Sequence, residues 1–264
     1  MFLARGVAVI LFLMKLIGPP LFLAVATLAA RRWGETAGGL IVALPLVSGP
    51  ISVILALENG ADFAVQAALG SLMGTAALAA FGVIYASLCP RSRLAAVVLG
   101  LAGFAGASAV LRSFSWTLPP LFGVTLLCIL ASSLLMPADQ GASVHRPPMK
   151  YDIPFRMALM LVLTFSVTTA AAWMGPAVSG IASSLPLMAT TMAWLAQGGG
   201  RAQDAQRVMR GLVNGLFSCT IFYVVLSLTL EEEHLWWGYL AAGLVTILMQ
   251  WGVFWLMERR KKNS

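Results

Sequence analysis

Charged residues are scarce in this sequence. Only 10% of its 264 residues are Asp, Glu, Lys or Arg, and 59% are hydrophobic, whereas a soluble domain usually carries about 25% charged residues. A chain of this length cannot hide that much apolar surface from water inside one soluble core. The composition therefore predicts an integral membrane protein that lipid covers.

The groups on which enzymes and metal sites depend are also few. The chain has three cysteines, without the spacing of metal ligands, and two histidines, which fall in predicted loops. It contains no glycine-rich phosphate loop, no Ser-His-Asp set and no pair of carboxylates. No carboxylate lies deep inside an apolar run, so proton coupling through a buried acid lacks a carrier. We therefore expect no enzymatic activity, no cofactor and no metal site.

Nine apolar runs are long enough to cross a bilayer, which takes about 17–25 helical residues. Since no alternating ten-residue pattern indicates membrane strands, we predict an all-α, polytopic bundle with nine transmembrane helices. Gly18-Pro19-Pro20 interrupts the first run, so residues 1–14 either extend this helix across the membrane or lie along its surface. The helices are expected at about 4–30, 36–57, 63–88, 94–111, 117–136, 155–174, 177–196, 206–230 and 235–257.

A shift of 141 residues aligns the chain with itself without a gap. Leu44-Pro45-Leu46 aligns with Leu185-Pro186-Leu187, and four glycines align with four others. Such matches in fixed register indicate a duplication. The sequence therefore predicts two four-helix repeats, 15–111 and 153–264, joined by a linker, 112–152, that contains the remaining helix. The aligned glycines are Gly34, Gly39, Gly70 and Gly74 with Gly175, Gly180, Gly211 and Gly215.

The two repeats are predicted to face opposite ways in the membrane. An odd number of helices separates equivalent positions, so equivalent loops lie on opposite sides. The basic residues agree, because Arg31-Arg32 aligns with Ala172-Trp173 and Arg91 aligns with Glu232. Basic loops mark the cytoplasmic side, which puts the N-terminus outside and the C-terminus in the cytoplasm. The net charge of +7 then reflects topology, and we expect no nucleic-acid partner.

Pro45 and Pro186 lie in the middle of the second predicted helix of each repeat. Proline removes a helical hydrogen bond, and in lipid the freed carbonyls need neighbours or a water-lined cavity. Paired breaks in inverted halves are typical of transporter binding sites; the alternative is a pair of tolerated kinks that allow close helix crossings. The other candidate substrate-binding residues near the prolines are small or carry hydroxyls: Ser48, Gly49, Ser52, Ser184, Thr190 and Thr191.

Three further polar residues are candidates for binding an anionic head group. Lys15, Arg210 and Asn214 lie within or beside apolar runs, where they form either a basic vestibule or interfacial anchors. Gly70/Gly74 and Gly211/Gly215 have the small-xxx-small spacing that lets helix backbones approach closely. This spacing favours a packing role and is consistent with contact between the two third helices.

Each repeat begins with a basic residue and an apolar span, followed by Gly-x4-Leu-Pro-Leu and a Gly-x3-Gly span. This pattern resembles small bacterial inner-membrane proteins of the GlpM-like kind, over residues 15–88 and again over 156–229. The resemblance implies a bacterial inner (cytoplasmic) membrane location and a tandem fusion of a smaller ancestor. It supplies no catalytic or substrate residues.

These features predict a transporter or flippase-like carrier of an anionic or amphipathic small molecule, working by alternating access between the inverted repeats. The alternative is a non-catalytic structural or accessory subunit of an inner-membrane complex for envelope biogenesis, which the shortage of buried polar groups favours. Expected partners are membrane lipids and a small-molecule or lipid-like substrate. A membrane protein or further copies of the chain are also candidate partners.

Overall fold

The computed structural model describes residues 2–45, 49, 52–53, 56–57, 60–138, 153–155, 157–159, 161–162, 185–199, 201–230 and 234–263. Its elements are helices, with no strand among the described residues. Five helices are long and apolar enough to cross a membrane. They are α4 (Ala61–Leu88), α5 (Arg93–Arg112), α6 (Leu118–Leu135), α10 (Ala202–Thr229) and the Leu235–Trp255 part of α11 (Leu235–Asn263). The predicted all-helical, multi-pass membrane class is confirmed, and these five match five of the nine predicted spans.

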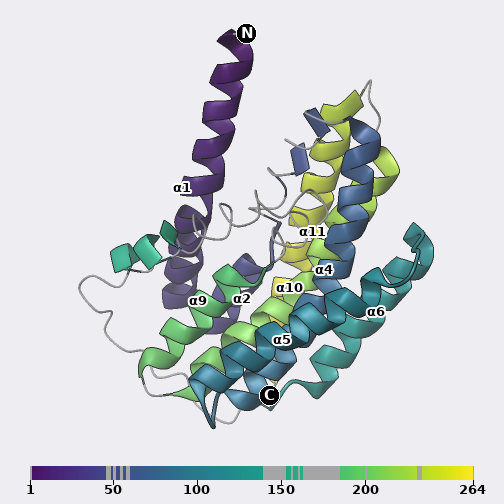
Figure 1. Ribbon diagram of the computed structural model, residues 1–264. Coiled ribbons are helices and arrows are strands. Elements are labelled where there is room, and N and C mark those ends of the chain that lie inside the picture. Colours follow the sequence, from purple (N-terminus) through teal and green to yellow (C-terminus); the bar gives the residue numbers. More distant parts are fainter. Residues whose placement is uncertain are drawn as a thin grey trace.

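α1 is a single helix from Phe2 to Trp33. Gly18-Pro19-Pro20 does not break this helix, because the fixed φ of proline, about −65°, is compatible with a helix that can lose two donors. Residues 2–14 therefore extend the first helix, which is one of the two predicted alternatives. Ile17, Leu21 and Val25 are exposed on one side, and Leu23 and Ala26 are buried on the other. The C-terminal half therefore packs on its neighbours, and Figure 1 shows the N-terminal half extending away from the other helices.

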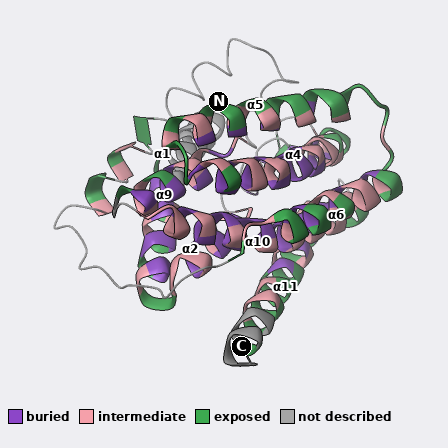
Figure 2. Cartoon of the chain, turned by 90° about the horizontal axis from the view of Figure 1, so that it is seen from below, coloured by how far each residue is buried: buried purple, intermediate pink, exposed green. Residues whose placement is uncertain are grey.

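α4 and α10 form the centre of the bundle and run antiparallel. Contacts between them pair early residues of one with late residues of the other: Thr75 lies 3.9 Å from Cys219, and the Gln206 side chain donates to the carbonyl of Ala86 at 2.9 Å. Both helices have 28 residues, and both of their ends are offset by 141 residues. Figure 2 shows these two helices largely buried, with α5, α6 and α11 presenting exposed outer faces.

A short helix, α2 (Glu35–Val42), crosses α10 with the two backbones in contact. A Cβ on Gly39 would overlap the carbonyl oxygen of Val208, and one on Gly211 would overlap that of Thr36. A Cβ on Gly215 would lie 3.1 Å from the carbonyl oxygen of Leu40. The predicted close approach is therefore present, but Gly211 and Gly215 face α2. The two third helices, α4 and α10, pack on each other through other residues.

Exposed tryptophans mark the two ends of the outer helix α11. Trp236 and Trp237 lie at its beginning, and Trp251 and Trp255 lie near the end of its apolar part. The guanidinium of Arg259 stacks over the Trp255 ring at 3.6 Å. From Trp236 to Trp255 the helix rises about 29 Å at 1.5 Å per residue, which is close to the thickness of the hydrocarbon core. This is the pattern of interfacial aromatic belts.

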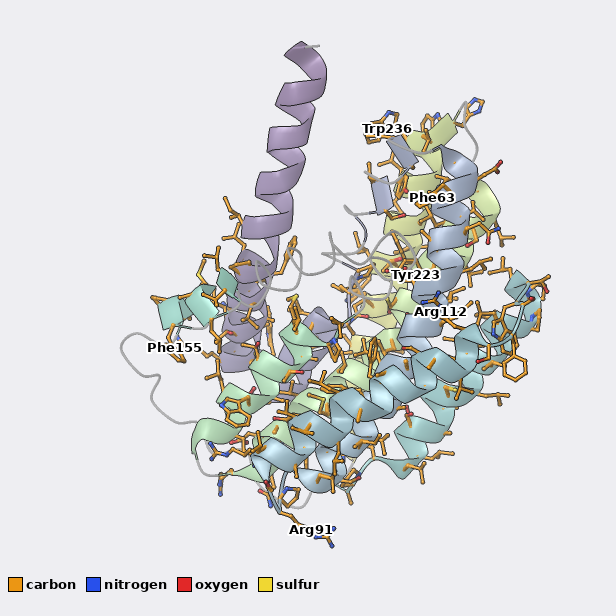
Figure 3. The ribbon with its side chains drawn as sticks, in the orientation of Figure 1. Phe63, Arg91, Arg112, Phe155, Tyr223 and Trp236 are labelled. Carbon is orange, nitrogen blue, oxygen red and sulfur yellow. The ribbon has the colours of Figure 1, made fainter. Side chains whose placement is uncertain are left out.

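The bundle has one end rich in arginine. Arg91 lies in the α4–α5 turn, Arg93 begins α5, and Arg201 directly precedes α10 at this end, which we call the basic end. Figure 3 shows Arg91 there and Phe63 and Trp236 at the opposite end. The α4–α5 turn and the beginning of α10 are thus on the same side of the bundle, as the predicted charge pattern requires.

Candidate functional site

The first helix break lies at Pro45. α2 ends at Val42, and the N–H of Leu44 donates to the carbonyl of Ile41 at 3.1 Å instead of to Leu40. The Leu40 carbonyl therefore loses its usual donor. The side-chain amide of Gln250 on α11 donates to it at 2.8 Å. A neighbouring helix repairs the break, as an apolar environment demands.

Contacts with α11 place Pro45 near the middle of that helix's apolar span. On one side of the break Leu40 meets Gln250, and on the other Ser52 shares a 2.9 Å hydrogen bond with the hydroxyl of Tyr239. The centre of the Leu235–Trp255 span lies between these two α11 residues. Pro45 lies between the same two levels, so the break is deep within the bundle.

The second break lies at Pro186, which directly precedes α9 (Leu187–Ala196). Pro186 is buried, and its carbonyl accepts two hydrogen bonds from Thr190, one from the N–H at 2.8 Å and one from the hydroxyl at 2.6 Å. The Thr190 hydroxyl thus stabilises the first turn of α9. Pro45 therefore follows one short helix and Pro186 precedes another, and residues 163–184, before Pro186, lie outside the described residues.

The two short helices pack side by side. A Cβ on Gly38 of α2 would lie 2.8 Å from the terminal methyl of Met192 on α9. The sulfur of Met192 also accepts the hydroxyl of Thr27 on α1, at 3.7 Å. α1, α2 and α9 therefore form one packed group (Figure 1).

The helix directions put both breaks at similar depth. α2 runs away from the basic end, since Thr36 meets Gly211 and Leu40 meets Gly215 further along α10. α9 runs toward the basic end, because Gln197 directly follows it and contacts Arg93 there. From the Gly38–Met192 contact, Pro45 is seven residues onward and Pro186 six residues back, about 10 Å in each case.

The remaining residues around the breaks differ in what they offer a ligand. Gly49 is buried, and a Cβ there would lie 3.6 Å from the ring of Phe222. Ser52 is occupied by Tyr239. Thr191 is only 2% exposed, and its hydroxyl has no hydrogen-bond partner among the described residues. Thr191 is therefore the candidate with an available polar atom. Ser48 and Ser184 lie outside the described residues.

Two residues of the predicted basic vestibule lie on α10. Arg210 donates to the carbonyl of Pro137, directly after α6, and Asn214 lies one turn further along α10. These residues lie about 100° around the helix from Gly211 and Gly215, which face α2. Lys15 is part of α1, but its side chain lies outside the described residues. The guanidinium of Arg210 is therefore directed toward the end of α6.

A second polar group, which the sequence analysis did not identify, lies at the basic end. Gln197 follows α9, and Gln206 is in the first turns of α10. Their side chains donate to backbone carbonyls at the end of α4, with Gln197 Nε2 lying 2.6 Å from the carbonyl of Cys89. Pro90 was the available signal, because it leaves the Ala86 carbonyl without a helical donor. The described residues contain no group of three or more His, Cys, Asp or Glu suited to a metal ion.

No protein-family model, curated protein or solved structure matches this chain. The resemblance to GlpM-like proteins therefore stays a prediction.

Proposed function

We propose that the protein is a membrane carrier, of transporter or flippase type, that moves an anionic or amphipathic small molecule by alternating access. The observation that carries this proposal is the pair of helix breaks at Pro45 and Pro186. They occupy equivalent positions 141 residues apart, lie at similar depth and adjoin two helices in contact, α2 and α9. Carriers built from inverted repeats bind their substrates at such breaks near the midplane.

The central helix pair supports the inverted repeat. α4 and α10 have equal length, a fixed offset of 141 residues and antiparallel packing. A two-fold axis in the membrane plane relates equivalent helices in this antiparallel way. We therefore retain the proposal of nine helices in two inverted repeats within a bacterial inner membrane.

The charge distribution supports the orientation and the class of substrate. Arg91, Arg93 and Arg201 gather at one end, which the positive-inside rule assigns to the cytoplasm. Arg207 and Arg210 add positive charge on α10, and Asp204 pairs with Arg207 at 3.3 Å. An excess of positive charge at this entrance attracts anions. The N-terminus would then be outside and the C-terminus inside.

Flux measurements in proteoliposomes test the carrier. Anionic solutes and lipid-linked sugars should cross the membrane of vesicles that contain the purified protein faster than that of vesicles without protein. Pro45→Ala and Pro186→Ala should each lose most of the flux, because a continuous helix restores the main-chain bonds and closes the breaks. Pro119→Ala, at an exposed proline in the first turn of α6, is the matched control and should retain it. The proposal would be contradicted if every solute crossed no faster than in vesicles without protein, or if neither Pro45→Ala nor Pro186→Ala reduced the flux.

One observation favours the alternative, an accessory subunit of a membrane complex. Hydroxyls in the bundle mostly bond the backbone of their own helix one turn earlier, so they do not line a polar path in this conformation. α11 also presents many exposed apolar side chains to its surroundings. Purification in mild detergent discriminates, since a stoichiometric partner supports this role. The hydroxyls concerned include those of Thr27, Ser71, Thr75, Thr125, Thr220 and Thr246.

A further inference from the structure

Four hydrogen bonds join the region of the α4–α5 turn to the short turn after α9 and the beginning of α10. At the turn, Arg93 Nη2 donates to the carbonyl of Gln197 at 2.7 Å, and Gln197 Nε2 donates back to the carbonyl of Cys89 at 2.6 Å. Gln206 Nε2 reaches the carbonyl of Ala86 at 2.9 Å, and the thiol of Cys89 lies 3.7 Å from the carbonyl of Ala202. We call these six residues the polar latch.

Two of these bonds involve carbonyls at the end of α4 that have no N–H donor within the helix, and the thiol of Cys89 lies between the carbonyls of Ala86 and Ala202, at 3.5 and 3.7 Å. Pro90 lacks the N–H that would bond the Ala86 carbonyl, and the carbonyl of Cys89 lies beyond the last helical turn. Glutamines from the other half of the chain supply the missing donors. Separation of the two loops would expose these groups to water at the membrane surface, where water can replace the lost partners.

The opposite end of the bundle has a different kind of closure. A shift of 141 residues carries Gln197, Gln206 and Cys89 to Ala56, Val65 and Leu230. Ala56, Ala61 and Leu230 are buried in one apolar cluster there. The basic end is therefore held by directional hydrogen bonds between the proposed repeats, and the other end by apolar contact.

We propose that the polar latch holds the basic end closed, and that this end opens only when its four hydrogen bonds break together. The inference rests on the proposed function, because it assigns the described conformation to the state of the carrier that is closed at the basic end. Each repeat contributes one side of the latch, so rocking of one repeat on the other must separate residues 86–93 from residues 197–206.

Cys89 is a native reporter of the latch. Its side chain is 1% exposed, and burial raises the pKa of the thiol to about 11, from an ordinary value of 9.0. The thiolate is the form that reacts with maleimides. If the latch opens, the pKa returns toward 9.0 and the thiolate fraction at pH 8 rises up to about 100-fold, with a further gain from exposure.

The test measures maleimide labelling at pH 8 of the full-length protein in vesicles, resolved by peptide mass spectrometry. Gln197→Ala and Arg93→Ala each remove latch bonds and should speed Cys89 labelling at least about tenfold over the native protein. Arg91→Ala removes the same charge from the same turn at an exposed position, and should leave the rate unchanged. Cys219, buried in α10, serves as the internal reference for unfolding.

Three results would overturn the latch: no acceleration in either variant, equal acceleration in Arg91→Ala, or labelling of Cys219 that rises in parallel. The readout does not depend on transport. Faster labelling of Cys89 in the variants, without solute flux in the native protein, would support the latch and contradict the carrier function. Solute flux without faster labelling would contradict the latch alone.

Discussion

Replacement of Gly211 by alanine is expected to force α2 away from α10 and to destabilise the protein by about 3 kcal/mol or more. The added methyl group would overlap the carbonyl oxygen of Thr36 and lie 3.0 Å from the Cα of Gly39. The obstacle is backbone on a packed helix, so no side-chain rotation relieves it. Thermal unfolding in detergent, followed by size-exclusion chromatography, measures the loss.

Gly70→Ala is the matched control for this experiment. Gly70 is the 141-residue equivalent of Gly211 and belongs to the same small-xxx-small motif, but a Cβ there would meet nothing within 4 Å. Because alanine favours helix by up to about 1 kcal/mol over glycine, this variant should be neutral or slightly stabilised. Equal destabilisation of both variants would show that the α2–α10 contact is not the cause.

Gln250→Leu is expected to cost about 1–3 kcal/mol of stability, because it leaves the carbonyl of Leu40 buried without a donor. The leucine keeps the apolar volume of the side chain, so the loss reports the hydrogen bond at 2.8 Å. Met249→Leu, at a neighbouring exposed position of α11, is the control and should leave the melting temperature unchanged.

A double-mutant cycle with Pro45→Ala separates repair of the helix break from general packing. Alanine at position 45 restores an N–H and lets α2 continue, so Leu44 can bond the Leu40 carbonyl as in a regular helix. Gln250→Leu should therefore cost clearly less in the Pro45→Ala background than in the native chain. Additive losses would mean that Gln250 does not act through the break.

The helices themselves were predictable from the sequence because length and apolar composition decide whether a segment can cross a membrane. α4 (Ala61–Leu88), α6 (Leu118–Leu135) and α10 (Ala202–Thr229) fall within a few residues of their predicted ranges. The helix ends beside Pro45 and Pro186 were predictable for a similar reason, since the missing N–H is a local property of proline. Gly18-Pro19-Pro20 shows the limit of that rule, because a long helix accommodates these prolines.

The partners of the helices were not predictable, because they depend on which faces meet. The Gly211/Gly215 spacing indicates a face of small residues that another helix can approach closely. It does not indicate that α2, rather than α4, packs on this face. The roles of Gln197, Gln206 and Gln250 were missed because the amide of a glutamine, whether in a polar loop or in an apolar run, fits many partners. A proline indicates that a carbonyl nearby lacks its helical donor, and only the three-dimensional arrangement identifies which carbonyl is served and by which side chain.

The tryptophans of α11 also set the bilayer thickness at which this protein is most stable. Trp236 and Trp255 fix both ends of a rod whose outer side chains are exposed, and stretching or compressing the surrounding acyl chains costs a fraction of a kcal/mol per Å of mismatch. Thermal stability in reconstituted vesicles should therefore peak at an intermediate chain length and fall in both shorter and longer lipids. A flat response across chain lengths would argue against indole anchoring at both interfaces.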